Sequence, residues 1–582
     1  MQEKKLTGYP SIDKPWLKYY SQEAINAPLP ECTIYEYLWK NNKDHLDDVA
    51  LNYFDNNIKY SDLFRFIKSA ASAFSQIGVK NGEIVTFCTV TLPETIYSLY
   101  ALNMLGAVAN MTDPRTSVEG LREYIKEVDS RVIICIDAVY SKIIDAVKGT
   151  NVQKIIVISP SDSLSYVKKA AYKLLKARKQ LFNSNTIIWK DFIAIGKKQS
   201  VNPVSYKTDQ CCAIVHTGGT TGTPKGVMLS NENFNEMAIS FTYNGLSFER
   251  RRILLSIMPP FIAYGLVNGI HVCLCRSMKI VMVPLFDPNK LDELVLKYHP
   301  SHMLATPTHY DALINSKKVT DHTDLSFIKM TGIGGDGLHI NNERRLNEFF
   351  ESHNCASKAI KGYGMTEVSA AACANRPENN AVGSVGLPFV KVIISAFEPG
   401  TDKELKYGEK GEICIYSPST MLGYYNNEEE TERILRLHSD GKKWIHSGDI
   451  GYVAEDGNVF IEGRIKRMII RNDGFKVFPL QIERVLMNNS NIENCCVVAT
   501  PDKQYSQGSL PLAFVVKAKC AMITEEAVKA GLKAMCRKEL PEYAQPIDFV
   551  FVEALPLTTI GKIDYRALEK QAEEWNKEKV SF

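Results

Sequence analysis

Short apolar runs alternate with helical patterns along much of this chain, and that alternation limits the fold more than any other feature. Residues 84–90 (IVTFCTV) form an apolar run, and Pro93 then opens a helical pattern that extends to residue 110. Similar apolar runs occur at residues 131–136, 154–158 and 280–283, the last followed by a helical pattern over 288–298. Buried strands joined by crossover helices predict an α/β protein with layered and largely parallel sheets.

The pattern changes after residue 383. Short strands with close turns at residues 383–399, 408–418 and 449–463 predict antiparallel hairpins. Beyond residue 463 we expect a helix over residues 481–489, a strand over 495–500, a helix over 524–540 and a strand over 549–556. We therefore predict a large N-terminal domain over residues 1–463, built of layered α/β sheets plus a β-rich subdomain, and a small mobile α+β domain over residues 464–582.

The charge balance argues against a nucleic-acid-binding protein. The 582 residues include 69 Lys and Arg against 66 Asp and Glu, so the net charge is only +3. The 14 cysteines form no CxxC pair and no zinc-like cluster, which indicates buried, reduced thiols. The amino terminus lacks the continuous apolar run of a secretory signal. Together these features predict a cytoplasmic protein.

The longest uncharged stretch, residues 253–275, raises the question of a membrane span. Pro259 and Pro260 would interrupt a helix there, and His271 adds a polar group. We expect a buried strand, a turn and a core helix instead.

Residues 216–227 (HTGGTTGTPKGV) carry the strongest chemical signal. Threonine, glycine, proline and lysine bury little apolar surface, so the backbone of this segment is its useful part. Glycines let backbone amides approach an anion, threonine hydroxyls donate hydrogen bonds to it, and Lys225 adds a positive charge. A phosphate-binding loop is the functional interpretation and a flexible surface turn the alternative. It is not a Walker A loop, because Pro224 precedes Lys225 and Gly226 follows it.

Other segments favour the functional interpretation. Residues 362–367 (GYGMTE) offer an aromatic face, a hydroxyl and a carboxylate suited to Mg²⁺, although core packing and a solvated acid would also explain them. Residues 446–452 (HSGDIGY) place Asp449 between a turn and a strand. Arg464 follows, and Lys562 lies on a turn after the last expected strand.

These segments, in this order, resemble the adenylate-forming superfamily of acyl-CoA synthetases, nonribosomal-peptide adenylation domains and luciferases, over roughly residues 30–580. The resemblance implies an AMP-forming acyl-CoA synthetase, an ATP-dependent acid:CoA ligase. It activates a carboxylic acid through an acyl-adenylate and then forms a CoA thioester. ATP, Mg²⁺ and CoA as co-substrate are implied with it.

The resemblance also implies roles for individual residues. The loop that holds the ATP phosphates comprises Thr217, Gly218, Gly219, Thr220, Thr221, Gly222, Thr223 and Lys225. In the next segment Tyr363, beside Gly364, stacks on adenine, Thr366 touches a phosphate and Glu367 binds Mg²⁺. Asp449 and Arg464 resemble the ribose-binding pair.

Three further positions belong to the C-terminal segment. Lys562 resembles the catalytic lysine that bridges the substrate carboxylate and the α-phosphate, so the catalytic set is Lys562, Thr366 and Glu367. Lys466 occupies the hinge about which the small domain rotates, and Gly474 resembles the loop that lines the thiol tunnel. A lysine that cancels charge as two anions meet agrees with this assignment.

Two departures from the family are visible. Relatives commonly read SGTTG where this chain has GGTTG at residues 218–222, so a glycine replaces one phosphate-facing hydroxyl. Ile560 stands where relatives commonly have asparagine.

The substrate acid is expected to have an apolar tail. Phe261 is followed by Ile262, where amino-acid-activating relatives carry an aspartate for the substrate ammonium. Residues 331–338 (TGIGGDGL) match the acyl pocket, where the glycines either leave room for a chain or form a tight turn. We predict a fatty or aryl acid.

Residues 164–182 form a basic amphipathic helix by pattern, with no acidic residue. Its basic residues are Lys168, Lys169, Lys173, Lys176, Arg178 and Lys179. One interpretation is peripheral contact with an anionic membrane or an acidic partner, and the other is a solvated face. An acyl carrier protein in place of CoA is the alternative acceptor, and a nucleotide-binding scaffold without activity is a third hypothesis.

Overall fold

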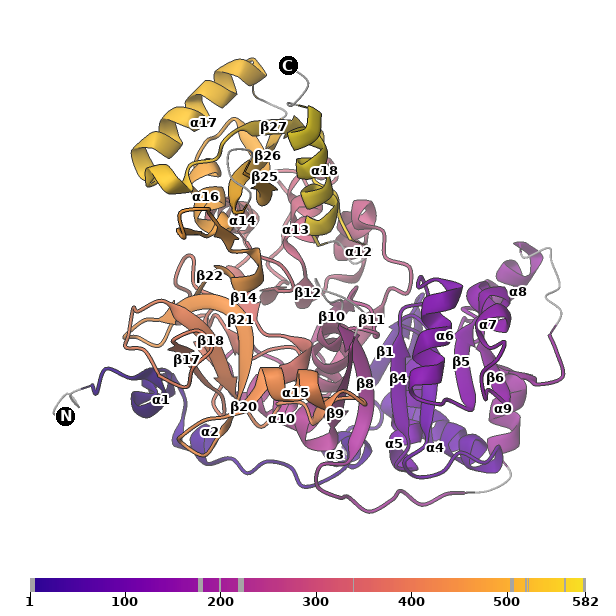
Figure 1. Cartoon of the computed structure of the whole chain (residues 1–582). Coiled ribbons are helices and arrows are strands. Elements are labelled where there is room, and N and C mark those ends of the chain that lie inside the picture. The colour runs from indigo at the N-terminus through magenta and orange to yellow at the C-terminus, as the bar shows by residue number, and fades with distance from the viewer. Residues whose placement is uncertain are drawn as a thin grey trace.

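The computed structural model describes residues 6–175, 182–197, 200–217, 225–338, 340–502, 507–518, 521, 523–558 and 562–578. The chain forms a mixed α/β protein with a large N-terminal part and a small C-terminal part that lies above it in Figure 1. The predicted fold class is confirmed.

One sheet of eight strands carries the start of the alternating pattern. Its order is β19 (Gly423–Tyr424), β9 (Lys225–Ser230), β8 (Cys211–Thr217), β4 (Val108–Thr112), β3 (Ile84–Cys88), β5 (Val132–Ile136), β6 (Lys154–Ile158) and β7 (Thr186–Ile188). The strands from β8 to β7 are parallel, β9 is antiparallel to β8, and β19 is antiparallel to β9. Helices of this part are α4 (Tyr60–Gln76), α5 (Pro93–Met104), α6 (Val118–Glu127), α7 (Tyr140–Ala146), α8 (Tyr166–Leu175) and α9 (Trp189–Gly196). Helix α5 begins at Pro93, as predicted, and is buried along its whole length.

A second sheet of nine strands completes the layered core. Its order is β16 (Leu387–Pro388), β15 (Cys373–Ala374), β14 (Ala359–Tyr363), β13 (Met330–Ile333), β12 (His302–Ala305), β10 (Ile253–Ser256), β11 (Lys279–Met282), β1 (Val49–Tyr53) and β2 (Asn56–Lys59). Strands β14 to β1 are parallel. The helices here are α3 (Ile34–Asn42), α10 (Asn231–Tyr243), α12 (Leu291–Tyr298), α13 (Pro307–Ile314) and α14 (Ile340–Ser352).

The uncharged stretch at residues 253–275 is a core element, as predicted. Strand β10 leads through a turn into a π-helix, η3 (Tyr264–Val272), and the short α11 (Cys273–Cys275), and almost all of their side chains are buried. Among the described residues, no helix is both long and apolar enough to cross a bilayer.

The β-rich region is antiparallel, as expected. It consists of β17 (Ile393–Phe397), β18 (Gly411–Tyr416), β21 (Lys443–Val453), β20 (Leu435–Leu437) and β22 (Val459–Arg464), with α15 (Glu428–Ile434) before β20. The N-terminal helices α1 (Pro10–Asp13) and α2 (Gln22–Asn26) pack near it, with Trp16 and Trp444 in one buried cluster.

The C-terminal part has apolar clusters of its own. Strands β25 (Ile492–Pro501), β26 (Ser509–Lys517) and β27 (Phe549–Val552) form its sheet, β23 (Ile469–Ile470) pairs with β24 (Lys476–Val477), and its helices are α16 (Pro479–Leu486), α17 (Glu525–Glu539) and α18 (Tyr565–Glu578). The sequence patterns missed β26 and α18. The boundary between residues 463 and 464 stays a prediction.

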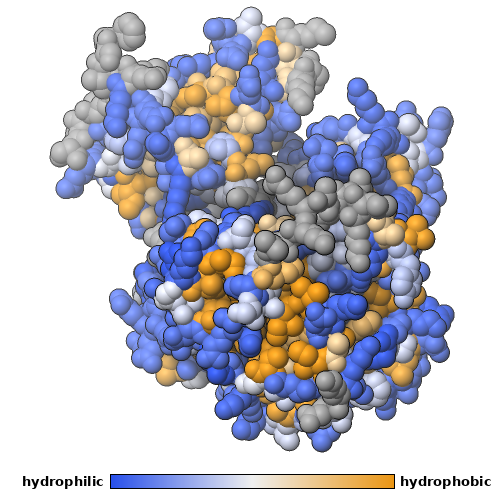
Figure 2. Space-filling model, turned by 90° about the vertical axis from the view of Figure 1, so that its right-hand side faces the viewer, coloured by the Kyte–Doolittle hydropathy of each residue, from blue (hydrophilic) through white to orange (hydrophobic). Residues whose placement is uncertain are grey.

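Cysteines among the described residues are free thiols, and all but Cys211 are buried. The basic segment begins with α8, on the side of the molecule that faces the viewer in Figure 2, where hydrophilic residues cover much of the surface. Tyr166 is 95% exposed and Val167 81% exposed, while Lys168 is paired with Asp55 at 2.7 Å. Lys176, Arg178 and Lys179 lie outside the described residues.

Candidate active site

A large cavity lies where the two sheets, the β-rich region and the C-terminal part meet. Its volume is about 2000 Å³. The predicted site residues that line it are Thr217, Lys225, Gly364, Thr366, Glu367, Arg464, Lys466 and Lys562. Side chains that are far apart in the sequence therefore share one space.

The predicted phosphate loop joins two antiparallel strands. Thr217 ends β8 and Lys225 begins β9, and the two residues pair across the hairpin. The ammonium of Lys225 lies 4.8 Å from the ring centre of Tyr424 and forms an ion pair with Glu430. Gly218, Gly219, Thr220, Thr221, Gly222 and Thr223 lie outside the described residues.

The segment after β14 brings a buried carboxyl group to the cavity. Gly364 allows the turn, because a Cβ there would lie 2.3 Å from the carbonyl oxygen of Ala370. Glu367 follows in a 3₁₀ turn and accepts a 2.7 Å hydrogen bond from the hydroxyl of Tyr424. Burial raises the pKa of Glu367, so a cation placed beside it would favour the charged form. Thr366 lines the same wall.

Tyr363, Asp449 and Arg464 form a connected group. The Tyr363 hydroxyl donates to Asp449 Oδ2 at 2.6 Å, and Arg464 Nε lies 2.9 Å from Asp449 Oδ1. Asp449 and Arg464 face each other across β21 and β22, so the sheet register fixes the pair. Burial raises the pKa of Asp449, and the Arg464 charge opposes that rise.

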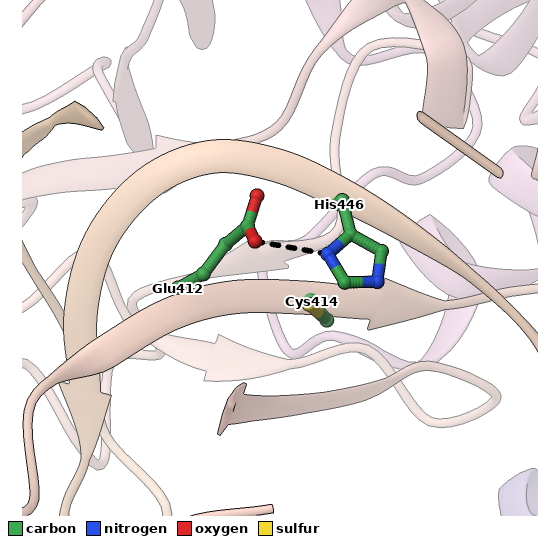
Figure 3. A group of neighbouring side chains, drawn as sticks. All are labelled: Glu412, Cys414 and His446. Carbon is green, nitrogen blue, oxygen red and sulfur yellow. Dashed lines mark hydrogen bonds and ion pairs between the residues drawn. The ribbon is translucent and has the colours of Figure 1, made fainter. Parts of the chain in front are cut away.

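A buried Glu–His pair holds the turn before Asp449. Glu412 accepts from the backbone amide of Gly448 at 3.1 Å, and its other oxygen lies 2.9 Å from His446 Nδ1, as Figure 3 shows. The second nitrogen of His446 lies 2.9 Å from His438 Nε2. Cys414 lies beside this pair, with the three possible ligand atoms within 4.8 Å of one another, and burial raises the pKa of its thiol. We interpret the group as a clamp on the Asp449 turn.

Lys562 reaches the cavity from the C-terminal part. Its backbone amide donates to Thr558 Oγ1 at 3.2 Å, which closes a small turn. Its Cε lies 3.8 Å from where a Cβ on Gly335 would stand, so the side chain meets the turn after β13. Burial lowers the pKa of Lys562, as expected for a desolvated amine.

Lys466 and Gly474 lie in different surroundings. Lys466 belongs to the 3₁₀ turn Ile465–Arg467 and lines the cavity. Gly474 forms the turn between β23 and β24 with φ +81°, and is not among the described residues that line the cavity. Among the described candidates, Tyr363, Asp449 and Gly474 do not line the cavity, although Asp449 is paired with Arg464, which does, and with Tyr363.

The same cavity also has many apolar lining residues. Its lining includes Phe241, Leu246, Ile257, Met258, Phe261, Ile262, Leu304, Met330, Ile333 and Phe389, which we call the apolar wall. His309 also lines the cavity, and burial lowers its pKa to about 4, so it is neutral near pH 7. Gly335 has φ +84° and forms a tight turn, whereas a Cβ on Gly332 would lie 2.8 Å from Leu304 Cδ2.

Sequence reasoning missed several residues of the site. Tyr424 and Glu430 lie in the segment GYYNNEEET, whose tyrosine pair and acidic helix start were the available signal. Glu412 was visible only as part of an expected strand, and His438 had no local signal.

Comparison with known proteins agrees with this geometry. Residues 38–425 match the family described as AMP-binding enzyme, and residues 481–562 match the AMP-binding enzyme C-terminal domain. This chain therefore belongs to the AMP-binding enzyme family. Within that family it is of the adenylate-forming, acyl-CoA synthetase-like type, which confirms the resemblance found in the sequence.

The relatives cover nearly the whole chain. A long-chain-fatty-acid–CoA ligase of Bacillus subtilis (strain 168) is 28% identical over 571 residues, which is 96% of this chain and 98% of the relative. A probable 4-coumarate–CoA ligase 1 of Dictyostelium discoideum is 27% identical over 584 residues, which is 97% of this chain and 98% of the relative.

Solved structures share the fold. ATP-bound MatB from Rhodopseudomonas palustris matches with a TM-score of 0.79 at 22% identity, over 93% of this chain and 99% of that one. The anthranilate CoA ligase AuaEII with anthranoyl-AMP matches with a TM-score of 0.79 at 21% identity, over 95% and 99%.

Proposed function

We propose that this protein is an ATP-dependent acid:CoA ligase that activates a fatty or aryl carboxylic acid as its acyl-adenylate and then transfers the acyl group to CoA. The observation that carries this proposal is that one cavity is lined by Lys562 together with other cationic side chains and by the apolar wall. Such a cavity suits a polyanion and an uncharged tail together.

The basic residues support a nucleotide as the polyanion. Lys225, Arg464, Lys466 and Lys562 all line the cavity. We assign the triphosphate to the loop between Thr217 and Lys225, the adenine to Tyr363 and the ribose to Asp449 with Arg464. Glu367 would hold Mg²⁺, which supplies positive charge to the phosphates when bound. The buried carboxyl of Glu367 at the cavity wall fits that group.

In the first half-reaction a carboxylate oxygen attacks the α-phosphorus, a new O–P bond forms, and the bond to pyrophosphate breaks. Two anions meet, so the Lys562 ammonium is needed between them to cancel charge as the transition state forms. Thr366 is assigned a hydrogen bond to phosphate. The products are acyl-AMP and pyrophosphate.

In the second half-reaction a thiol sulfur attacks the acyl carbon and AMP leaves. Lys562 has no catalytic role in that step, and its side chain occupies space near the acyl-phosphate. We therefore assign the second step to a different placement of the C-terminal part, rotated at Lys466 so that the Gly474 turn faces the cavity. The Gly474 turn is exposed in the present arrangement, which agrees with this assignment.

The substrate preference follows from the apolar wall. An α-amino acid is disfavoured because Ile262 follows Phe261 where amino-acid-activating relatives carry an aspartate, so the substrate ammonium would lack that counter-charge. The fatty-acid and 4-coumarate specificities printed for the two relatives are consistent with an apolar tail.

The proposal also covers the acceptor of the acyl group and the cellular location of the protein. CoA is the first candidate, and a carrier-protein phosphopantetheine is the second, because the described part of the basic segment exposes Tyr166 and Val167 beside Lys168. The same face is the candidate for peripheral membrane contact. We assign the protein to the cytoplasm.

Pyrophosphate exchange across a panel of carboxylates tests the first half-reaction, with CoA and then a carrier protein supplied as acceptor. We expect exchange with fatty or aryl acids and a CoA-dependent thioester. Exchange followed by transfer only to the carrier protein would favour the alternative acceptor, and absence of ATP binding in the presence of magnesium would contradict the proposal.

A further inference from the structure

The carboxylate of Glu430 is paired with Lys225, the cation at the end of the predicted phosphate loop. Its Oε2 forms an ion pair with Lys225, and its Oε1 lies 2.7 Å from Arg433 Nη1. The Lys225 side chain is 28% exposed and that of Glu430 25% exposed, so neither group is fully solvated. Hydrogen bonding to Lys225 lowers the pKa of Glu430, which is therefore charged near neutral pH.

This contact is built into the backbone arrangement. Strand β19 pairs with β9 and places Tyr424 beside Val227, only two residues from Lys225. Helix α15 follows at once, and its residue Thr431 accepts a 2.9 Å hydrogen bond from the amide of Tyr424. The Asn427 side chain caps the helix by accepting from the Glu430 amide at 3.1 Å. Glu430 is thus held at the loop by the sheet and the helix start together.

No other part of the proposed reaction uses this carboxylate. Glu367 lines the cavity from the 3₁₀ turn after β14 and bonds Tyr424, and Asp449 bonds Tyr363 and Arg464. Glu430 instead neutralises a cation that the proposed function assigns to the ATP phosphates. An incoming triphosphate must therefore compete with it.

We propose that Glu430 is an internal substitute for nucleotide phosphate, which holds Lys225 while the site is empty, yields it to ATP, and takes it back as pyrophosphate leaves. This inference rests on the proposed function, because it requires Lys225 to contact ATP. It makes Glu430 a positioning residue whose charge weakens the binding of ATP and pyrophosphate but not that of AMP.

The sign of the effect separates this role from a structural one. Loss of a merely structural contact weakens ligand binding, whereas loss of a competitor strengthens it. A partly exposed ion pair has a modest worth, so Glu430→Gln should lower the dissociation constants of Mg-ATP and pyrophosphate by roughly two- to fivefold.

The test is equilibrium binding of Mg-ATP, pyrophosphate and AMP to the whole protein, with thermal unfolding to check that each variant is folded. Glu429→Gln is the matched control, because Glu429 is the exposed neighbour with the same charge on α15. Lys225→Met with and without Glu430→Gln completes a double-mutant cycle.

We expect tighter Mg-ATP and pyrophosphate binding in Glu430→Gln than in Glu429→Gln, unchanged AMP binding, and no effect of Glu430→Gln when Lys225 is methionine. Unchanged or weaker Mg-ATP binding in Glu430→Gln, or an equal gain in the Lys225→Met background, would overturn the inference alone. A wild-type protein that binds no ATP would overturn the proposed function and this inference with it.

Discussion

Tyr363 and Asp449 are joined by a 2.6 Å hydrogen bond, although they lie 86 positions apart in the sequence. The residue assigned to adenine and the residue assigned to ribose therefore do not act independently. Asp449 is buried, so its orientation depends on both Tyr363 and Arg464.

Tyr363→Phe should raise the KM for ATP by roughly tenfold, because it keeps the ring but leaves one oxygen of a buried carboxylate without its donor. The rate at saturating ATP should change much less. Steady-state kinetics across ATP concentrations measures both, and Tyr452→Phe on strand β21 is the control. An unchanged KM would show that the hydrogen bond does not orient Asp449.

Lys562→Ala should lower adenylate formation by at least about 100-fold while sparing thioester formation from supplied acyl-AMP. Single-turnover measurements of each half-reaction separate the two steps. Equal losses in both would contradict the role assigned to Lys562.

The pH dependence of adenylation should also reflect Lys562. Burial lowers the pKa of this amine, so its charge is lost as pH rises through a value below that of an ordinary lysine. Adenylation should therefore fall on the alkaline side at a lower pH than a solvated lysine predicts, and Lys562→Arg should keep its residual activity to higher pH. A wild-type profile that stays flat through that range would argue against a desolvated amine.

Glu412→Gln should destabilise the fold by about 1–3 kcal/mol near pH 7, because Glu412 accepts from both Gly448 and His446. Burial alone would raise the pKa of Glu412, but these hydrogen bonds outweigh it and lower the pKa. A lowered pKa means that the stabilisation is present above the unfolded-state value and is lost as pH falls through the folded-state value. Urea unfolding from pH 7 down to about pH 3 should show the difference between the proteins shrinking below the ordinary glutamate pKa of about 4.3, and a constant difference over that whole range would exclude the charge as its source.

Gly332→Ala should shift the preference toward shorter or slimmer acids. The added Cβ would lie 2.8 Å from Leu304 Cδ2 and 3.0 Å from Met330 Cε, and both side chains belong to the apolar wall. The ends of the Leu304 and Met330 side chains must therefore move, which changes the shape of the cavity beside them. Gly337→Ala is the control, because a Cβ there meets nothing within 4 Å. Pyrophosphate exchange over an acyl-length series measures the shift.

Features encoded locally were visible in the sequence. The alternation that contains Pro93 gave β3, α5 and β4, and the proline pair at residues 259–260 excluded a long helix. Short-range periodicity reports burial on one or two faces, and turn residues report where elements end. The fold class and the family motifs follow from such signals.

The partners of the site residues were not visible. Lys225 and Glu430 lie 205 positions apart and are brought together by the pairing of β19 with β9. Tyr424 and Glu367 lie 57 positions apart, and backbone contacts such as that of Met421 with Glu367 hold their segments together. Strand β26 is central in its sheet but contains Pro511, a residue that argues against a central strand, and α18 has a mostly polar composition.

Arg464 is the last residue of β22 and stands two positions before Lys466. If the small domain rotates at Lys466, the Arg464 guanidinium that is paired with Asp449 lies close to the rotation axis. The rotation that brings the thiol to the acyl group would then also weaken the contacts to the ribose of AMP. Release of AMP and entry of the next reactants would therefore depend on a single motion.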